Sequence, residues 1–345
     1  MKIYEIGLIG CGAIASLHRD ALLACPGVRI AAVCDIVPER AEAMAVSIGA
    51  AAPDNGLVRV YEDWHRMLAE AKLDGVHLCT PHFLHPPMAI EAMRAGLHVL
   101  TEKPMGIAVA DVEEMVRVSS QTGKRLGVCF QNRYNTTSAR MRELIDSGRV
   151  GRVLGGRAVV TWKRDAGYYG SGPWRGTWDE EGGGVMINQA IHTLDLLQWF
   201  LGKPVSIRGS IDTRLLAGVI EVEDTADALI RFENGVNGLF YATNNYCTDA
   251  PVLLEIVCEK AVMRLDGDLT VRHADGMVET VAEKDVSTGE KAYWGCGHKV
   301  LVADWYARMR GRKAFPIDGQ TALPAMRLVL GLYESARSGR EVALD

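Results

Sequence analysis

The chain has 345 residues, a formal net charge of −5 and 48% hydrophobic residues, which is enough for about two globular domains with sizeable cores. Its mild acidity and lack of a Lys/Arg block argue against nucleic-acid binding, and no apolar run is long enough to cross a membrane. The eight cysteines form no C-x-x-C pair, so we expect free thiols, no metal site and a cytoplasmic location.

The first third of the chain alternates between strand and helix patterns, which is typical of a parallel sheet. Apolar runs predict strands at 3–9, 28–34, 75–80, 98–102 and 125–130. Helical periodicity predicts helices at 13–24, 38–48, 62–73, 86–95 and 110–122. Three of these helices are expected to end at Gly49, Gly96 and Gly123, in left-handed caps.

A glycine turn follows the first predicted strand. Gly10 permits a tight turn, Gly12 leaves the main chain open to a phosphate, and Ala15 lets the next helix pack closely on the strand. The start of that helix offers N–H groups and a partial positive charge to a pyrophosphate. The expected cofactor contacts of this turn are Gly10, Gly12, Ala13, Ile14 and Ala15. The alternative is a glycine turn with a structural role alone.

Asp35 ends the second predicted strand, about 20 residues after the glycine turn, where a carboxylate can accept hydrogen bonds from the adenosine ribose. A carboxylate there repels the 2′-phosphate of NADP, and Arg40 is the one cation nearby, either at the cofactor or facing solvent. The pattern therefore favours NAD over NADP. We predict a doubly wound α/β Rossmann domain over residues 1–133.

Further polar residues follow the next two predicted strands. Ligands of open α/β sheets bind at the carboxyl ends of the strands, so we expect cofactor contacts at Thr80, Pro81, His85, Glu102 and Lys103. His82 and His85 flank a proline-rich turn, which favours a loop role over a metal site. Lys103 can hydrogen-bond the reacting oxygen and favour an alkoxide-like species, whereas the alternative is a solvated surface lysine.

Residues 134–345 are predicted to form an α+β domain for substrate binding and oligomerisation. A helix at 135–147, a strand at 152–162 and a helix at 185–201 precede antiparallel strands over 205–281, and helices at 297–311 and 319–338 follow. A sheet covered by helices on one face leaves its other face open. We therefore expect a homodimer or homotetramer through that open face.

Two segments of this second domain carry polar residues suited to a substrate. Asn188, His192 and Asp195 share one face of a predicted helix, and imidazole titrates near neutrality, which suits proton transfer. A histidine that only packs the helix is the alternative. Aromatic residues alternate with arginines over 162–178, a pattern that suits the binding of sugar rings and anionic groups. The alternative is a loop that is packed by its own aromatic side chains. The expected substrate contacts are Lys103, Arg164, Tyr168, Trp174, Arg175, Asn188 and His192.

Taken in order, these motifs resemble the glucose-fructose oxidoreductase/inositol dehydrogenase/MocA (Gfo/Idh/MocA) family over essentially the whole chain. The motifs are the glycine turn, Thr80-Pro81, Glu102-Lys103-Pro104, the block 182–195 and the closing segment 331–339. The resemblance implies a Rossmann domain followed by an open-faced, mostly antiparallel sheet. It also implies NAD(P)-dependent oxidation or reduction of a sugar, cyclitol or related polyol.

Lys103 and His192 match the catalytic lysine and histidine of that family, and Asn188 stands where many members have aspartate. An amide orients a hydroxyl but accepts no proton, so His192 is expected to carry more of the acid–base work. Trp174-Arg175-Gly-Thr-Trp178 with Asn188-Gln189 resembles a branch that includes nucleotide-sugar dehydrogenases and ketoreductases.

Two alternatives to a dehydrogenase stay open: a glycoside hydrolase that uses bound NAD transiently, and a regulatory protein that binds NAD without turnover. A regulatory protein needs neither Lys103 nor His192. A late glycine-rich stretch with Tyr293 and His298 is a weaker candidate for the cleft.

Overall fold

The computed structural model describes residues 2–283 and 297–344. It divides into two compact units: Met1–Phe130 with His298–Ala322, and Gln131–Gly297 with Leu323–Asp345. The segment 298–322 therefore lies with the first unit, whereas the prediction assigned all of 134–345 to the second domain. Tyr293 of the late glycine-rich stretch lies outside the described residues.

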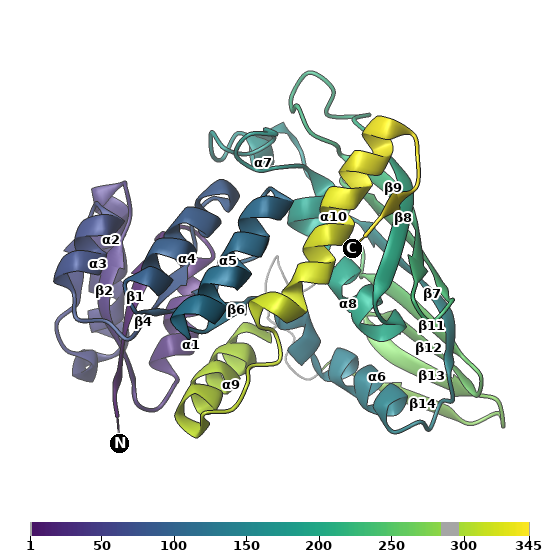
Figure 1. Ribbon diagram of the computed structural model, residues 1–345, viewed down its shortest axis with the longest axis horizontal. Helices are drawn as coiled ribbons and strands as arrows, with labels where there is room; N and C mark the ends of the chain where they lie inside the picture. Colours follow the sequence, from purple (N-terminus) through teal and green to yellow (C-terminus); the bar gives the residue numbers. More distant parts are fainter. Residues whose placement is uncertain (1, 284–296, 345) are drawn as a thin grey trace. The chain divides into compact units, whose positions relative to one another are not determined.

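The first unit is built on a six-stranded parallel sheet in the order β3-β2-β1-β4-β5-β6 (Figure 1). Its strands are β1 Tyr4–Ile9, β2 Val28–Cys34, β3 Arg59–Tyr61, β4 Gly75–Leu78, β5 His98–Thr101 and β6 Leu126–Val128. Its helices are α1 Ala15–Leu23, α2 Pro38–Ala51, α3 Trp64–Glu70, α4 His85–Arg94, α5 Val109–Thr122 and α9 Gly297–Gly311. The strand order reverses beside β1, and ligands of such sheets bind at that point.

Two helix ends in this unit agree with the prediction and one does not. Gly123 caps α5 in the left-handed region, and Gly96, also at positive φ, follows the last residues of α4. The predicted end of α2 at Gly49 is wrong, because the helix continues to Ala51. Pro53 comes two residues later and offers no N–H for a further helical bond, so it limits the helix instead.

The second unit contains a nine-stranded sheet in the order β14-β13-β12-β11-β7-β10-β9-β8-β15. Only β7 and β10 run parallel among these described strands. The strands are β7 Val153–Thr161, β8 Pro204–Asp212, β9 Thr225–Phe232, β10 Asn237–Thr243, β11 Leu253–Cys258, β12 Ala261–Asp266, β13 Asp268–His273, β14 Val278–Val281 and β15 Val342–Ala343. The predicted mostly antiparallel sheet is thereby confirmed.

Helices cover one face of this sheet (Figure 1). They are α6 Thr136–Asp146, α8 Ile191–Leu201 and α10 Gly319–Ser338, and the short α7 Ala166–Tyr169 lies in the loop after β7. The inner face buries Ala158, Phe240 and Ile256, whereas Leu239 on the outer face is 56% exposed. Within the described residues, no helix has the length and apolar content needed to span a bilayer.

The helix predicted over 185–201 changes from π-helical to α-helical geometry along its length. Met186–Ala190 form a π-helical turn, and α8 starts only at Ile191. Asn188 therefore lies in the π-helical turn, whereas His192 and Asp195 lie in the α-helix. Such turns occur frequently at functional sites.

Candidate active site

The glycine turn after β1 has the geometry that an anion-binding turn needs. Gly10 has φ +86°, and a Cβ there would lie 2.6 Å from the carbonyl oxygen of Cys79, so only glycine fits. A Cβ on Gly12 would meet no atom within 4 Å, so space lies open beside the turn. Ala15 is fully buried at the start of α1.

The start of α1 leaves main-chain donors available to a ligand. Ile14 at the N-cap position makes no side-chain cap, and Ala15 N–H bonds the Gly12 carbonyl at 3.1 Å. The N–H groups of Ala13 and Ile14 have no acceptor in the part of the chain that the structure describes. Free N–H groups at a helix start suit a phosphate, so this segment fits a dinucleotide.

Asp35 lies directly after β2 and contacts the glycine turn. Its Oδ2 accepts a hydrogen bond from the Cys11 N–H at 2.7 Å, and its Oδ1 accepts one from the Val37 N–H at 2.9 Å. These bonds fix the carboxylate beside the turn, where the ribose contact is predicted. Arg40 is exposed on α2.

His85 joins the segments that follow β4 and β5. Its Nε2 lies 2.9 Å from the Thr80 carbonyl oxygen, and its Nδ1 lies 2.7 Å from that of Pro104. Burial lowers the pKa of His85 below its ordinary value, and the side chain has no exposed surface. We therefore expect His85 to contribute to cofactor binding indirectly, because it joins the two segments that carry Thr80, Pro81 and Lys103.

Lys103 follows β5, and the carboxylate before it is anchored from two helices. Glu102 Oε1 lies 2.8 Å from His18 Nε2 on α1 and 3.1 Å from His298 Nε2 on α9. Its Oε2 accepts the Lys103 N–H at 3.3 Å. Burial opposes ionisation of Glu102, but hydrogen bonds from the two histidines hold its pKa well below the usual range.

A row of buried hydrogen bonds continues behind Glu102. His18 Nδ1 lies 2.8 Å from His77 Nδ1, and His77 Nε2 lies 2.9 Å from the Tyr306 hydroxyl. Burial lowers the pKa of His77 well below its ordinary value. The row thus joins Tyr306, His77, His18 and Glu102 through successive contacts of hydrogen-bond length.

The residues of this row come from α1, β4, α9 and the end of β5, and only Glu102 belongs to a local motif. Sequence analysis therefore gave His18, His77 and Tyr306 no role. Cys129 Sγ lies 4.0 Å from His18 Nε2, and its thiol has a pKa raised well above the ordinary value by burial. The ligand atoms of His18, Glu102 and Cys129 lie within 4.8 Å of one another, and His18 and Glu102 already share a 2.8 Å hydrogen bond.

In the second unit, the predicted substrate contacts gather around one hydroxyl group. The Tyr168 hydroxyl oxygen lies within hydrogen-bond distance of three donors: Arg175 Nη1 at 2.7 Å, Gln189 Nε2 at 3.0 Å and Asn188 Nδ2 at 3.2 Å. The Arg175 guanidinium also lies 4.4 Å from the ring centroid of Trp174 and 4.6 Å from that of Tyr168. Tyr168, Trp174, Arg175 and Asn188 are thus brought together.

Arg164 lies in the same region but is already paired. Its Nη1 is 2.9 Å from Asp249 Oδ1, and its guanidinium lies 5.4 Å from the Trp162 ring and 5.2 Å from the Tyr168 ring. The side chain is buried. A substrate that contacts Arg164, as predicted, would therefore bind a guanidinium group that already pairs with Asp249.

Asn188 also contacts a buried carboxylate that sequence analysis missed. Its Nδ2 lies 2.5 Å from Glu181 Oε1, and Glu181 Oε2 accepts the Gly176 N–H at 2.5 Å. Glu181 has no exposed surface. It directly precedes the glycine run 182–184, and its sequence position alone gives no sign of a contact with the π-helical turn.

His192 and Asp195 follow on α8 with different partners. His192 Nε2 lies 3.4 Å from Gln131 Nε2. Asp195 forms two hydrogen bonds with the Arg133 guanidinium, at 2.6 and 2.7 Å, and both side chains are buried. Asp195 therefore stabilises the start of the second unit, and the acid–base role of His192 stays a prediction.

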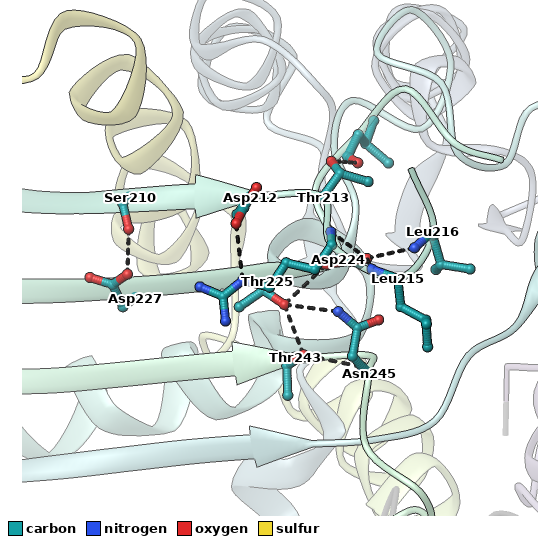
Figure 2. Close-up of polar contacts among 12 residues, drawn as sticks. Ser210, Asp212, Thr213, Leu215, Leu216, Asp224, Thr225, Asp227, Thr243 and Asn245 are labelled. Carbon is teal, nitrogen blue, oxygen red and sulfur yellow. Dashed lines mark hydrogen bonds and ion pairs between the residues drawn. The ribbon is translucent and has the colours of Figure 1, made fainter. Parts of the chain in front are cut away.

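The loop between β8 and β9 is held by the buried Asp224 (Figure 2) and contacts the aromatic segment through Glu221. The buried Asp224 accepts hydrogen bonds from the main-chain N–H groups of Arg214, Leu215 and Leu216. The same loop contains Glu221, whose carbonyl oxygen accepts a hydrogen bond from Trp178 Nε1–H at 3.0 Å. The aromatic segment is therefore hydrogen-bonded to a loop that has its own polar contacts.

Comparison with known proteins gives the family of the chain. Residues 4–130 match the description "Oxidoreductase family, NAD-binding Rossmann fold", and residues 138–264 match "GFO/IDH/MocA C-terminal domain". The chain belongs to the Gfo/Idh/MocA family. It is accordingly an oxidoreductase with an NAD-binding Rossmann domain, as the motifs predicted.

The WlbA dehydrogenase of Bordetella pertussis, solved with NADH and UDP-GlcNAcA, is 31% identical with a TM-score of 0.82, covering 100% of this chain and 99% of that one. The D-glucoside 3-dehydrogenase of Escherichia coli is 25% identical over 99% of this chain and 97% of its own length. Inositol 2-dehydrogenase 2 of Saccharopolyspora erythraea is 30% identical over 67% of this chain and 64% of its own.

Proposed function

We propose that this protein is an NAD-dependent dehydrogenase that oxidises a hydroxyl carbon of a sugar or cyclitol, with a nucleotide sugar as the favoured class. The observation that carries the proposal is the gathering of the glycine turn, Asp35 and Lys103 at the carboxyl edge of one parallel sheet. The full-length similarity to a dehydrogenase solved with NADH and a nucleotide sugar supports the substrate class.

The residues of the first unit fit a dinucleotide. The open space beside Gly12 and the N–H groups of Ala13 and Ile14 would hold the pyrophosphate, and Asp35 would accept hydrogen bonds from the ribose. The negative charge of Asp35 favours NAD over NADP. When bound, NAD supplies the hydride acceptor for the oxidation.

Lys103 and His192 would each assist one part of the oxidation of the substrate hydroxyl. Lys103 would hydrogen-bond the substrate oxygen and stabilise the negative charge that develops on it. His192 would take the hydroxyl proton on its imidazole, and Asn188 would orient a hydroxyl without accepting a proton. Tyr168, Trp174 and Arg175 would contact the rest of the substrate, because their rings and guanidinium group suit sugar faces and anionic groups.

The proposal includes a homo-oligomer and a reducing compartment. The outer face of the second unit's sheet carries the exposed apolar side chains Leu239, Val257 and Val278. The described cysteines are free, and six of the seven are buried, which suits a cytoplasmic protein.

The test is NADH formation by the purified protein with NAD⁺ and a panel of cyclitols, aldoses, sugar acids and nucleotide sugars, repeated with NADP⁺. A strong NAD-dependent response to one substrate class supports the proposal. Glycoside cleavage without net NADH would assign the hydrolase instead. NAD binding with neither reaction would assign the regulatory protein.

A further inference from the structure

The main chain at Lys103 is held by contacts on both sides of the residue. The Glu102 N–H donates to the Leu78 carbonyl oxygen at 2.9 Å, and the Pro104 carbonyl oxygen lies 2.7 Å from His85 Nδ1. Between these two anchors, the Lys103 N–H donates to Glu102 Oε2 at 3.3 Å. The Glu102 carboxylate is therefore one of the groups that fix the peptide from which the Lys103 side chain extends.

The other oxygen of this carboxylate is held from two distant parts of the chain. Glu102 Oε1 lies 2.8 Å from His18 Nε2 on α1 and 3.1 Å from His298 Nε2 on α9. Hydrogen bonds from these two histidines hold the pKa of Glu102 well below the usual range, so the carboxylate acts as an acceptor. With Oε1 bound to both imidazoles, Oε2 is the oxygen that accepts the Lys103 N–H.

Burial makes these contacts costly to lose. Glu102, His18 and His298 are 4%, 0% and 6% exposed. A buried carboxylate that loses a donor keeps the cost of its desolvation, because water has little access to replace the donor. It then takes up a proton or turns toward its other side-chain partner, the Cys129 thiol. Either change weakens the hydrogen bond that it accepts from the Lys103 N–H.

The two histidines differ in their other contacts. His18 Nδ1 also lies 2.8 Å from His77 Nδ1, so a substitution of His18 disturbs two hydrogen-bond contacts. Among the described residues, Glu102 is the one hydrogen-bond partner of the His298 side chain, whose ring centroid lies 5.8 Å from that of His18. A substitution of His298 therefore acts most directly on Glu102.

We propose that His18 and His298 are positioning residues of the active site, which hold the Glu102 carboxylate so that it fixes the main chain at Lys103. The inference rests on the proposed dehydrogenase function and adds to it two residues that act on the catalytic lysine through Glu102. Lys103 stabilises charge on a substrate oxygen only where its side chain reaches that oxygen, so a small displacement of its main chain lowers the rate.

The first experiment compares two substitutions of His298. His298→Leu removes the hydrogen bond to Glu102, whereas His298→Gln keeps an N–H group near the place of Nε2. We expect kcat of His298→Leu to fall about tenfold with KM within about twofold of wild type, and kcat of His298→Gln to stay within about threefold. The pair His18→Leu and His18→Gln should show the same order.

His98→Leu is the matched control. His98 lies at the other end of the same strand, β5, where its Nδ1 accepts the Arg125 N–H at 3.0 Å. Its loss should lower the melting temperature and leave kcat unchanged. A histidine with a structural role alone would behave like His98, whereas His298 is expected to change kcat.

A double variant shows whether His298 acts through Lys103. In the Lys103→Met background, His298→Leu should lower kcat no further, because the side chain that it positions is already gone. The full tenfold loss repeated in that background would overturn the proposal. Equal kcat values for His298→Leu and His298→Gln would also overturn it, since the hydrogen bond to Glu102 would then have no part in the effect.

A measurement without substrate separates this proposal from the proposed function. The rate of reductive methylation of Lys103, followed by mass spectrometry of its peptide, should change about threefold or more in His298→Leu and stay near wild type in His298→Gln and His98→Leu. Equal rates in all four proteins would overturn the positioning role. A wild-type protein with no turnover on any panel substrate would contradict the proposed function, while the methylation rates still decide whether His298 positions Lys103.

Discussion

Local sequence motifs identified some residues of the candidate site and missed others. The glycine turn, Asp35 and Lys103 each follow a buried strand, so their places could be predicted from the chain order. Glu181 could not be predicted in this way, because its partner Asn188 lies in another segment and their contact depends on a π-helical turn.

Lys103→Met tests the proposed catalytic lysine. Methionine keeps the length of the side chain but removes the charge and the N–H donors, so we expect kcat to fall about a hundredfold or more. The affinity for NAD⁺, measured by fluorescence titration, should stay within about twofold, because the pyrophosphate and ribose contacts are elsewhere. A variant that keeps wild-type kcat would contradict the role of Lys103.

Asp35→Asn tests the cofactor preference. The substitution keeps the size of the side chain but removes the charge that repels a 2′-phosphate, so the ratio of kcat/KM for NADP⁺ to that for NAD⁺ should rise by about tenfold. Glu39→Gln on the next helix is the matched control, because its carboxylate is exposed. Equal cofactor ratios in Asp35→Asn and wild type would show that Asp35 does not select the cofactor.

At the scale of elements, strongly periodic segments were predicted well and short ones were not. The strands β1 and β2 fall within a residue of their predicted bounds because they are buried, apolar and followed by turn residues. The strand β3 was missed because it has only three residues, two of them exposed. The π-helical turn was missed because its five residues are apolar or amide-bearing and continue the helical pattern.

The start of that π-helical turn depends on a buried carboxylate with unusual titration. Glu223 accepts hydrogen bonds from the N–H groups of Gly184 and Met186 and from the Tyr333 hydroxyl. Burial nevertheless raises the pKa of Glu223 to about 7. Because the folded pKa lies above the unfolded value, the protonated form stabilises the fold, and this contribution is lost as pH rises through about 7.

Glu223→Gln should therefore flatten the pH dependence of stability. The wild-type free energy of unfolding should fall by about 3 kcal/mol between pH 5 and pH 8, an order-of-magnitude value from the size of the pKa shift. Glutamine does not titrate, so the variant should not lose this contribution. Its free energy of unfolding should therefore increase relative to that of the wild type as pH rises. Denaturant unfolding at pH 5 and pH 8 measures this, and parallel pH profiles for the two proteins would contradict it.

At the scale of the whole molecule, the two-part architecture followed from the change of pattern after residue 133. The family resemblance and both sheet types were confirmed. The division of the chain into the two units is not a single cut in the sequence, because residues 298–322 belong to the first unit. A helical pattern over 297–311 predicts a helix but does not indicate which of the two sheets it packs against.

The uncovered sheet face gives a prediction about assembly. Leu239 is exposed and lies in register between Leu229 and Arg157 on the neighbouring strands. If this face joins two copies, Leu239→Arg should convert the oligomer to a monomer at micromolar concentration, measured by sedimentation, because it buries a charge at the interface. Leu57→Arg, at an exposed position of the first unit, should leave the mass unchanged. A monomeric wild type, or an unchanged mass in Leu239→Arg, would contradict assembly through this face.

The return of α9 to the first unit has a consequence for how the protein is made. Trp305 of α9 is buried against β6, where a Cβ on Gly127 would lie 2.7 Å from its ring, and Tyr306 ends the hydrogen-bond row behind Glu102. A ribosome completes nearly the whole second unit before it adds these side chains. The core of the first unit therefore stays incomplete until α9 has been synthesised. A fragment that stops at residue 130 lacks the side chains of α9 that complete this core. A shortened form of the enzyme must therefore keep α9 in the same polypeptide as β6.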